Sequence, residues 1–229
     1  MKNKILTTIF GVAVFFFIIT VSIGLPIYFR FFYYLQIDSL SLPQKTGLSY
    51  AEIRTAFDDV MNFLTLPNYP FGTGALSFTE AGKAHFIDCK ALFNLNLAVL
   101  LTSTAIIVTL LALSRFKIFS FCRPFGMSVT FISAISIFIV IAVLFGLVAI
   151  DFENAFVVFH KIFFPGKDNW QFTNADEIIK ILPQEFFMNC AILIGAGIVL
   201  ISSSIIIFQL VKKAKRAKTT KFDKKRQRN

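Results

Sequence analysis

Histidine, tryptophan and cysteine are scarce in this chain of 229 residues, which has two histidines, one tryptophan and three cysteines. The cysteines, Cys89, Cys122 and Cys190, form no CxxC pair; Cys89 and Cys190 are candidates for a disulfide, but their spacing does not require one. No HExxH, no GxSxG and no glycine-rich phosphate loop occurs. These absences argue against a zincin, an elbow-type serine hydrolase and a nucleotide-binding loop.

Charged residues are also few, at 16%, against about 25% in ordinary soluble domains. Hydrophobic residues make up 56% of the chain, phenylalanine alone occurs 30 times, and the mean hydropathy is +0.71. A chain of this composition is neither a soluble globule, nor disordered, nor a small disulfide-rich secreted domain. It has the composition of a membrane protein.

Four apolar runs are long enough to span a bilayer, which requires about 20 residues. They cover 5–28, 92–113, 127–150 and 191–211. The first is longer than the apolar core of a signal peptide, and no small-residue cleavage site follows it, so we expect it to be retained. The sequence therefore predicts an all-α integral membrane protein with four transmembrane helices.

Lysine and arginine are distributed unevenly between the segments that connect these runs. Segments 1–4, 114–126 and 212–229 together carry 15 basic residues and one acidic residue, a net charge of +14. Segments 29–91 and 151–190 carry 8 basic and 12 acidic residues, a net charge of −4. By the positive-inside rule we expect both termini and 114–126 to be cytoplasmic, and 29–91 and 151–190 to be extracellular.

The formal net charge of +10 thus reflects membrane topology and does not indicate a nucleic-acid partner. Ten of the basic residues lie in the tail, 212–229. Such a tail anchors the last span at the anionic inner leaflet. Binding of RNA or of a ribosome is the alternative for this segment.

The two outward segments are long for connections, and loops of that length are usually functional or contain structure of their own. Ser49–Glu52 is a capping-box pattern, followed by apolar residues at helical spacing as far as Pro67. A second pattern, Ser77–Glu80, predicts one helix that begins outside and continues as the second span. A short helix over 176–182 and a helix opened by Pro183 complete a small extracellular helical cap.

Both histidines lie in the outward segments. His85 precedes the second span, and Asp88, three positions further on, is expected to orient its ring. His160 lies beside a stripe of phenylalanines that share one helical face, Phe152, Phe156, Phe159 and Phe163. Interfacial histidines and a packing stripe are the structural alternatives. If the histidines are catalytic, the chemistry they permit is acid–base catalysis on a lipid-like substrate without a metal.

Several sequence motifs resemble a known family along nearly the whole chain. They are Phe159–Phe164, Asn169–Phe172, Leu182–Met188, and Leu76–Glu80 leading to His85 and Asp88–Lys90. The family they resemble is that of the lipoprotein intramolecular transacylases, bacterial four-span membrane proteins.

The resemblance implies that His85 and His160 are catalytic and that no cofactor or metal is needed. The substrate would be a membrane-anchored diacylglyceryl lipoprotein, whose sn-2 acyl chain moves to the α-amine of the N-terminal cysteine to give a lyso-form lipoprotein. The site would face outward from a bacterial cell membrane. We expect supporting roles for Asp88, Glu80, Asp151, Glu153 and Lys161, and a pocket lined by Phe156, Phe159, Phe163, Trp170, Tyr33 and Tyr69.

This chemistry suits two imidazoles. An α-ammonium has a pKa of about 7.7–8 and an imidazole about 6.5, so proton transfer between them is uphill by only about 2 kcal/mol. One histidine can free the amine and the other can stabilise the oxyanion or protonate the leaving alkoxide, and the sequence leaves open which does which. Two alternatives also stay open: a non-catalytic accessory subunit of a transporter or secretion complex, and a metal-dependent hydrolase that uses Asp88 or Glu153.

Overall fold

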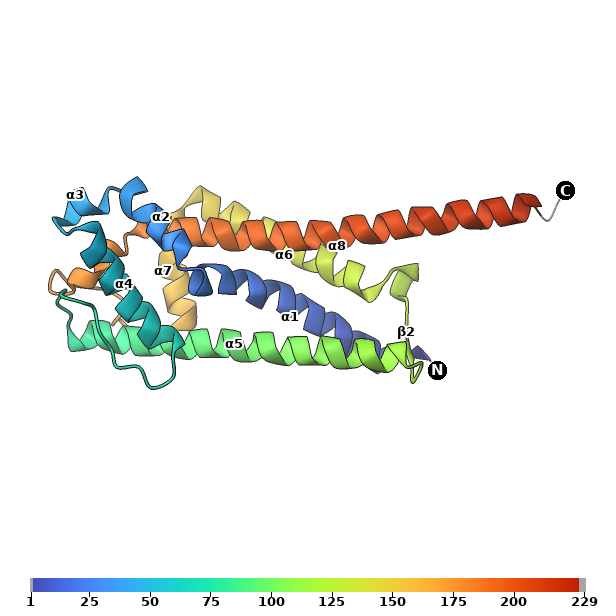
Figure 1. Ribbon diagram of the computed structural model, residues 1–229, viewed down its shortest axis with the longest axis horizontal. Coiled ribbons are helices and arrows are strands. Elements are labelled where there is room, and N and C mark those ends of the chain that lie inside the picture. Colours follow the sequence, from blue (N-terminus) through green and yellow to red (C-terminus); the bar gives the residue numbers. More distant parts are fainter. Residues whose placement is uncertain (1, 227–229) are drawn as a thin grey trace. The chain divides into compact units, whose positions relative to one another are not determined.

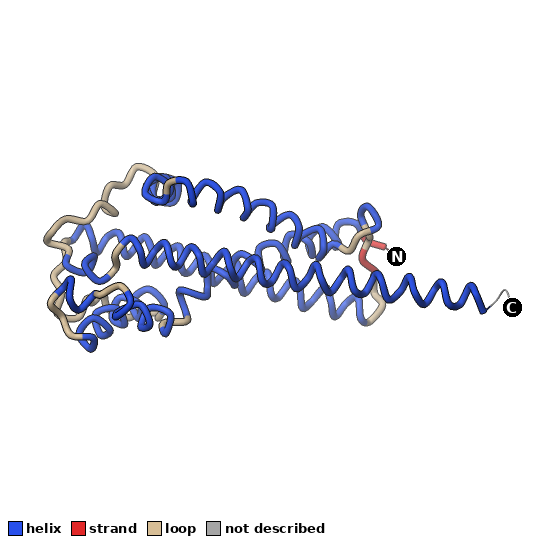
Figure 2. The backbone as a smooth tube through the Cα atoms, turned by 90° about the horizontal axis from the view of Figure 1, so that it is seen from above, coloured by secondary structure: helices blue, strands red, loops and turns tan. Residues whose placement is uncertain are grey.

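The computed structural model describes residues 2–226, with side chains for these residues except 2, 147–149 and 216–226. Helices make up most of the described chain (Figure 1, Figure 2). The residues cluster into two compact units. The first comprises Met1–Ile19, Leu100–Val143 and Ala196–Asn229, and the second comprises Thr20–Val99 and Leu144–Gly195. Both histidines belong to the second unit.

Four helices are long and apolar enough to cross a membrane: α1 (Lys4–Tyr28), α5 (Glu80–Arg115), α6 (Val129–Ile150) and α8 (Gln184–Arg226). They coincide with the four predicted apolar runs, which confirms the fold class. The 36 residues of α5 continue without a break, as predicted. At 1.5 Å per residue this helix is about 54 Å long, well beyond the ~30 Å thickness of a hydrocarbon core. It has the length to carry both a span and a polar site.

In the first unit, α1 and α6 approach each other closely at Gly11. A Cβ atom at this position would lie 2.6 Å from Val129 Cγ2, and Ser133 Oγ donates a hydrogen bond to the Gly11 carbonyl at 2.8 Å. Small residues let membrane helices pack backbone to backbone in this way. Two very short parallel strands, β1 (Lys2–Asn3) and β2 (Ser120–Phe121), pair in the same unit, and the 3-10 helix η1 spans Pro124–Gly126.

In the second unit, short helices form the cap: α2 (Phe31–Ser39), α3 (Leu42–Thr46), α4 (Tyr50–Thr65), α7 (Phe152–Phe163) and the 3-10 helix η2 (Glu177–Ile181). The predicted capping box at Ser49 and Glu52 forms, with both reciprocal hydrogen bonds present, and it starts α4. Tyr33 stacks on Phe57 with ring centroids 3.7 Å apart, at the centre of an apolar core. The prediction of a short helix near 176–182 is confirmed by η2.

Helices α2 and α3 were not predicted from the sequence. The N-cap residue of α2, Arg30, and that of α3, Ser41, both lack a side-chain capping hydrogen bond. Without a cap signal such short segments give no recognisable start. They are held instead by tertiary contacts, such as the hydrogen bond that Tyr33 donates to the Ile181 carbonyl at 2.7 Å.

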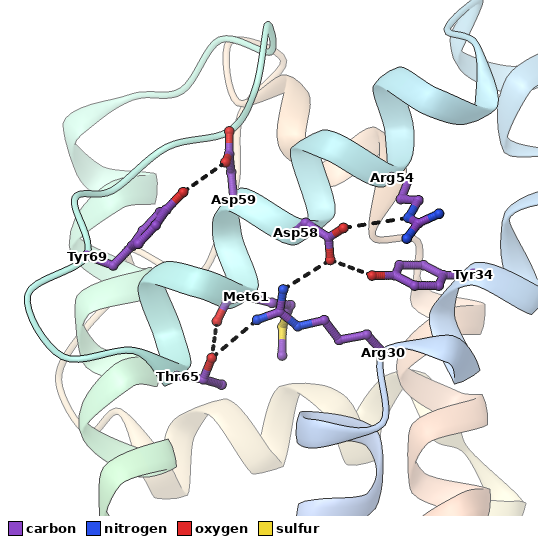
Figure 3. Close-up of polar contacts among 8 residues, drawn as sticks. All are labelled: Arg30, Tyr34, Arg54, Asp58, Asp59, Met61, Thr65 and Tyr69. Carbon is purple, nitrogen blue, oxygen red and sulfur yellow. Dashed lines mark hydrogen bonds and ion pairs between the residues drawn. The ribbon is translucent and has the colours of Figure 1, made fainter.

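A polar cluster centred on Asp58 joins α2 to α4 (Figure 3). The carboxylate of Asp58 accepts hydrogen bonds from Tyr34 Oη at 2.6 Å and from Arg30 Nη1 at 3.1 Å, and Arg54 Nε lies 3.7 Å away. The guanidinium of Arg54 also lies over the Tyr34 ring, 4.4 Å from its centroid. These contacts fix the orientation of the cap helices against each other.

The second predicted capping box, at Ser77–Glu80, does not form. Ser77 Oγ donates to the Ala175 carbonyl at 2.9 Å, and Glu80 pairs with Lys83. The start of α5 is capped instead by Thr79, whose Oγ1 accepts a hydrogen bond from the Gly82 N–H at 3.0 Å. The sequence pattern predicted the right helix but the wrong cap, because Ser77 has a partner nearly a hundred residues away.

Candidate active site

The two histidines of the chain meet in the second unit. Their ring centroids lie 5.7 Å apart and the ring planes are inclined by 35°. His85 comes from the second turn of α5 and is 5% exposed, and His160 comes from α7 and is 6% exposed. The structure thus brings together the two residues that the sequence singled out. Two buried imidazoles beside each other are uncommon in a packing role, since each carries polar atoms that need partners.

Helix α7 carries His160 on its buried face. Asp151 caps the helix by accepting a hydrogen bond from the Asn154 N–H at 2.9 Å. The predicted phenylalanine stripe divides into two parts: Phe156 is half-buried beside His160, whereas Phe159 and Phe163 are 46% and 49% exposed. The inner face of α7 is completed by the buried Phe164, which follows the helix.

A single contact determines the tautomer of His160. Its Nδ1 lies 2.7 Å from the Phe156 carbonyl oxygen, and since a carbonyl only accepts, Nδ1 carries the hydrogen. In the neutral ring Nε2 therefore holds the lone pair. Burial lowers the pKa of His160, and the hydrogen bond to Phe156 opposes that shift only in part. Trp170 stacks on the ring at 4.6 Å with an angle of 28°. His160 is thus a neutral base in an aromatic enclosure.

His85 has a different environment. Its Nε2 lies 3.4 Å from Cys89 Sγ, one turn further along α5. Its Nδ1 is buried and has no hydrogen-bond partner among the residues that the structure describes. The ring meets Phe164 edge-on at 4.8 Å and Phe172 at 5.6 Å. One nitrogen of His85 is therefore available for a group that enters the site.

We term residues 165–176 the strap. This segment contacts both histidines and is hydrogen-bonded to α5 and to the residue before it. Trp170 of the strap stacks on His160, and Phe172 packs against His85. Near one end, Lys167 Nζ and Asn169 Nδ2 donate to the two oxygens of Asp88, at 2.6 Å and 3.0 Å. The strap is thus attached to the same helix that carries His85.

Asp88 does not take the role that the sequence predicted for it. Its hydrogen bonds within the described part of the chain go to Lys167 and Asn169, and not to His85. The spacing of three residues places Asp88 on the same helical face as His85, but the strap supplies closer donors. Asp88 therefore organises the strap and not the histidine ring.

The other end of the strap is fixed by Asp176, a residue that sequence reasoning missed. This carboxylate is 2% exposed and accepts four hydrogen bonds, from the N–H and hydroxyl groups of Thr79 and Thr173, at 2.7–3.0 Å. Burial by itself would raise the pKa of Asp176, but these four bonds hold it below its usual value. The spacing Thr173-x-x-Asp176 is a local turn signal, which could have predicted the hydrogen bonds from Thr173 but not those from Thr79.

Apart from Phe159, the remaining predicted site residues make no hydrogen bond or ring contact with either histidine within the described part of the chain. Glu80, Glu153 and Lys161 are partly or fully exposed, Asp151 is the α7 cap, Tyr33 is in the cap core, and Tyr69 lies 3.4 Å from Asp59. Phe159 and Phe163 pack on each other at 4.6 Å, and only Phe159 also meets the His160 ring, at 5.4 Å. In the described part of the chain, no three His, Cys, Asp or Glu side chains are grouped so as to hold a metal ion.

Comparisons with known proteins agree with this picture. A family model described as lipoprotein intramolecular transacylase Lit matches residues 8–187. The solved structure of the membrane integral transacylase Lit from Bacillus cereus is 26% identical, has a TM-score of 0.80, and covers 92% of this chain and 97% of its own. Its H85A and H85R variants, numbered as in that protein, are each 25% identical with TM-scores of 0.73. The H85A structure covers 92% of this chain and 94% of its own, and the H85R structure covers 93% of each. No curated protein sequence matches the chain.

Proposed function

The chain belongs to the lipoprotein intramolecular transacylase family, and from that premise we propose that His85 and His160 are its catalytic residues. The enzyme is a membrane-embedded acyltransferase that acts on lipoproteins. In the proposed reaction the sn-2 acyl chain of a diacylglyceryl lipoprotein moves to the α-amine of the N-terminal cysteine. The observation that carries the proposal is the pair of buried rings, 5.7 Å apart, with a free nitrogen on each.

His160 is the general base in this proposal. Because Nδ1 is held by the Phe156 carbonyl, Nε2 has the lone pair that accepts a proton from the substrate amine. The lowered pKa favours the neutral ring, which is the form that acts as a base. The same carbonyl contact stabilises the imidazolium that forms during the step.

His85 is the oxyanion donor in this proposal. When the Cys89 thiol donates to Nε2, the neutral ring carries its hydrogen on Nδ1. That N–H is the buried group without a partner, and the oxygen of a tetrahedral intermediate would accept a hydrogen bond from it. A preorganised donor in a dry site is worth more than the same donor in water, because it needs no reorganisation.

The bonds and protons balance without a cofactor. The amine nitrogen forms a bond to the sn-2 carbonyl carbon, its proton passes to His160 Nε2, and the bond from that carbon to the glyceryl oxygen breaks. The departing alkoxide takes this proton from the His160 imidazolium and becomes a hydroxyl, so both imidazoles end in their neutral form. If the substrate binds as the ammonium, one further proton leaves to solvent. The products are an amide and an alcohol, and no water is consumed.

Positioning accounts for much of the expected rate. Amine and ester belong to one molecule, and effective molarities for well-oriented intramolecular groups reach about 10⁵–10⁸ M. Phe156, Phe164, Phe172 and Trp170 surround the two histidines with aromatic rings. Such walls fold the substrate and exclude the water that would otherwise hydrolyse the ester.

The uneven charge of the connecting segments supports an orientation with both termini in the cytoplasm. The cap and the histidine pair then lie at the extracellular face, where a lipoprotein is anchored after export. Two reporters fused to the C-terminus test this orientation: alkaline phosphatase, which is active only outside the cytoplasm, and a fluorescent protein that is fluorescent only inside it. A fluorescent C-terminal fusion supports it, and an active phosphatase fusion there contradicts it.

Substitution of each histidine tests the catalytic proposal. We expect His160→Ala and His85→Ala to lower N-acylation of a synthetic diacylglyceryl-cysteine peptide by about 10²–10⁴-fold, the usual size of acid–base effects. Lys161→Ala is the matched control, since Lys161 is exposed on the same helix and should leave the rate unchanged. A chelator should also leave the rate unchanged. Loss of activity on chelation would favour a metal-dependent reaction instead.

A further inference from the structure

The side-chain amide of Asn169 has a fixed orientation in the strap. Its Nδ2 donates to Asp88 Oδ2 at 3.0 Å, and because a carboxylate only accepts, the amide cannot be turned around without losing this bond. Its Oδ1 is buried, and among the described residues it accepts no hydrogen bond. A buried acceptor without a partner is rare in native proteins, and it calls for a specific explanation.

The neighbours of Asn169 belong to the histidine site. The next residue, Trp170, stacks on His160, and the Asp88 that holds the amide is less than one turn from His85 on α5. Among the described residues, the other buried polar side-chain atoms without a partner are Nδ1 of His85, Oδ1 of Asn96 and Oγ of Ser202, and of these only His85 belongs to the histidine site. An unpaired acceptor on the strap thus accompanies an unpaired donor on α5, the helix to which the strap is hydrogen-bonded.

The two nearby carboxylates, unlike this oxygen, already have partners. Both oxygens of Asp88 are engaged, one by Lys167 at 2.6 Å and one by Asn169. Both oxygens of Asp176 are engaged by Thr79 and Thr173. Asn169 Oδ1 is therefore a neutral acceptor without a partner, whereas the charge of Asp88 is already paired with Lys167.

We propose that Asn169 Oδ1 binds the α-amine of the substrate by accepting one of its N–H bonds. His160 Nε2 takes a second N–H proton, and these two contacts direct the nitrogen lone pair at the ester carbon, whose oxygen receives the His85 N–H. Asp88, held by Lys167, is a positioning residue that acts through Asn169. This inference rests on the proposed function and adds to it the residue that selects a free amino terminus.

A neutral acceptor suits this reaction better than a charged one. A carboxylate beside the amine would stabilise the ammonium, raise its pKa and remove the lone pair that must attack. An amide oxygen accepts an N–H from the ammonium and from the free amine alike. Asn169→Asp should therefore move the acid limb of the pH–rate profile to higher pH, a shift that a merely structural role of Asn169 would not produce.

Binding of two inert substrate analogues gives the decisive test. Both carry an ether in place of the sn-2 ester, one with a free α-amine and one with an acetylated amine. We expect the wild-type protein to bind the free-amine analogue about tenfold more tightly, as one additional hydrogen bond in a buried site predicts. Asn169→Ala should abolish that preference, and Asp88→Asn should reduce it.

Asn174→Ala is the matched control, since Asn174 is an exposed asparagine of the same strap and should keep the full preference. An unchanged preference in Asn169→Ala would overturn the inference even if that variant were less stable. The same preparations are assayed with the ester substrate, so that a failure of the proposed function can be distinguished from a failure of the inference about Asn169. Absence of acyl transfer by the wild-type protein would overturn the proposed function, whereas normal transfer with an unaltered amine preference in Asn169→Ala would overturn only this inference.

Discussion

The rings of His85 and His160 lie 5.7 Å apart although they come from two separate helices, α5 and α7. Each ring has one nitrogen engaged by its own helix, through Cys89 in one case and the Phe156 carbonyl in the other. The remaining nitrogens are a donor on His85 and an acceptor on His160. An amine that attacks an ester needs this combination, an acceptor for the N–H proton and a donor for the oxyanion.

The pH dependence of the reaction follows from these assignments. Burial lowers the pKa of His160, so this base stays neutral to a lower pH than a free imidazole does. The acid limb of kcat/KM should therefore report the substrate ammonium, with a pKa of about 7.7–8, and fall about tenfold per unit below it. A pH–rate profile with the synthetic peptide measures this. A fall of about a hundredfold per unit just below pH 7 would show that His160 is already protonated there.

The thiol of Cys89 should matter as a hydrogen-bond donor and not as a nucleophile. Cys89→Ala removes the group beside His85 Nε2 and should lower kcat by about three- to tenfold, the effect of one ordinary hydrogen bond. Cys89→Ser keeps a donor and should retain most of the rate. Cys190→Ala is the control, because Cys190 is another free, partly buried cysteine that packs on the cap core. Equal losses in Cys89→Ala and Cys190→Ala would reject a specific role for the thiol.

Asp176 should contribute strongly to the stability of the cap. Asp176→Ala leaves the Thr79 and Thr173 donors without their buried acceptor, at a cost of about 3 kcal/mol or more. Because the folded-state pKa is below the ordinary value, this contribution is present above about pH 3.9 and is lost as the pH falls through the folded pKa. Thermal unfolding of the detergent-solubilised protein measures the change. Asp168→Asn, an exposed carboxylate of the same strap, should unfold like the wild type.

Gly82 should be intolerant of even a methyl group. A Cβ atom at this position would collide with Asp176 Oδ1 and lie 3.1 Å from the Phe172 ring. Gly82→Ala should therefore displace the strap and lower both stability and activity, despite a helix propensity gain of about 1 kcal/mol. Gly24→Ala has the same gain in propensity, and its Cβ would make only an ordinary contact of 3.5 Å with Tyr28. If Gly82→Ala is as stable and active as Gly24→Ala, the close packing of strap and helix is not required.

What the sequence could predict depended on local signals. The four membrane helices follow from the length of apolar runs, α4 follows from its capping box, and the two histidines stand out because they are scarce. Helices α2 and α3 lack such signals and are held by packing against distant segments. The same limit explains the misassignment of Asp88, since helical spacing shows neighbours on one helix and not the Lys167 and Asn169 donors of the strap.

The division of the phenylalanine stripe has a related cause. A spacing of 4, 3 and 4 residues shows that four rings share a face of α7, but it does not show which part of that face meets the rest of the cap. Phe156 and Trp170 were expected to line the pocket, but the stacking of Trp170 on His160 and the hydrogen bond from His160 Nδ1 to the Phe156 carbonyl are seen only in the fold. Asp176 and Asn169 were missed for the same reason, because their partners on α5 are far away in the sequence.

The central claim is that His85 and His160 catalyse transfer of an acyl chain within one substrate molecule. The most direct test mixes two diacylglyceryl-cysteine peptides, one with a light peptide and a light sn-2 chain and one with both parts heavy, and locates every chain by fragmentation mass spectrometry. We expect N-acylated products that are wholly light or wholly heavy with the wild-type protein, and almost none with His85→Ala or His160→Ala. Mixed light–heavy products, or N-acylation at the wild-type rate by either histidine variant, would contradict it.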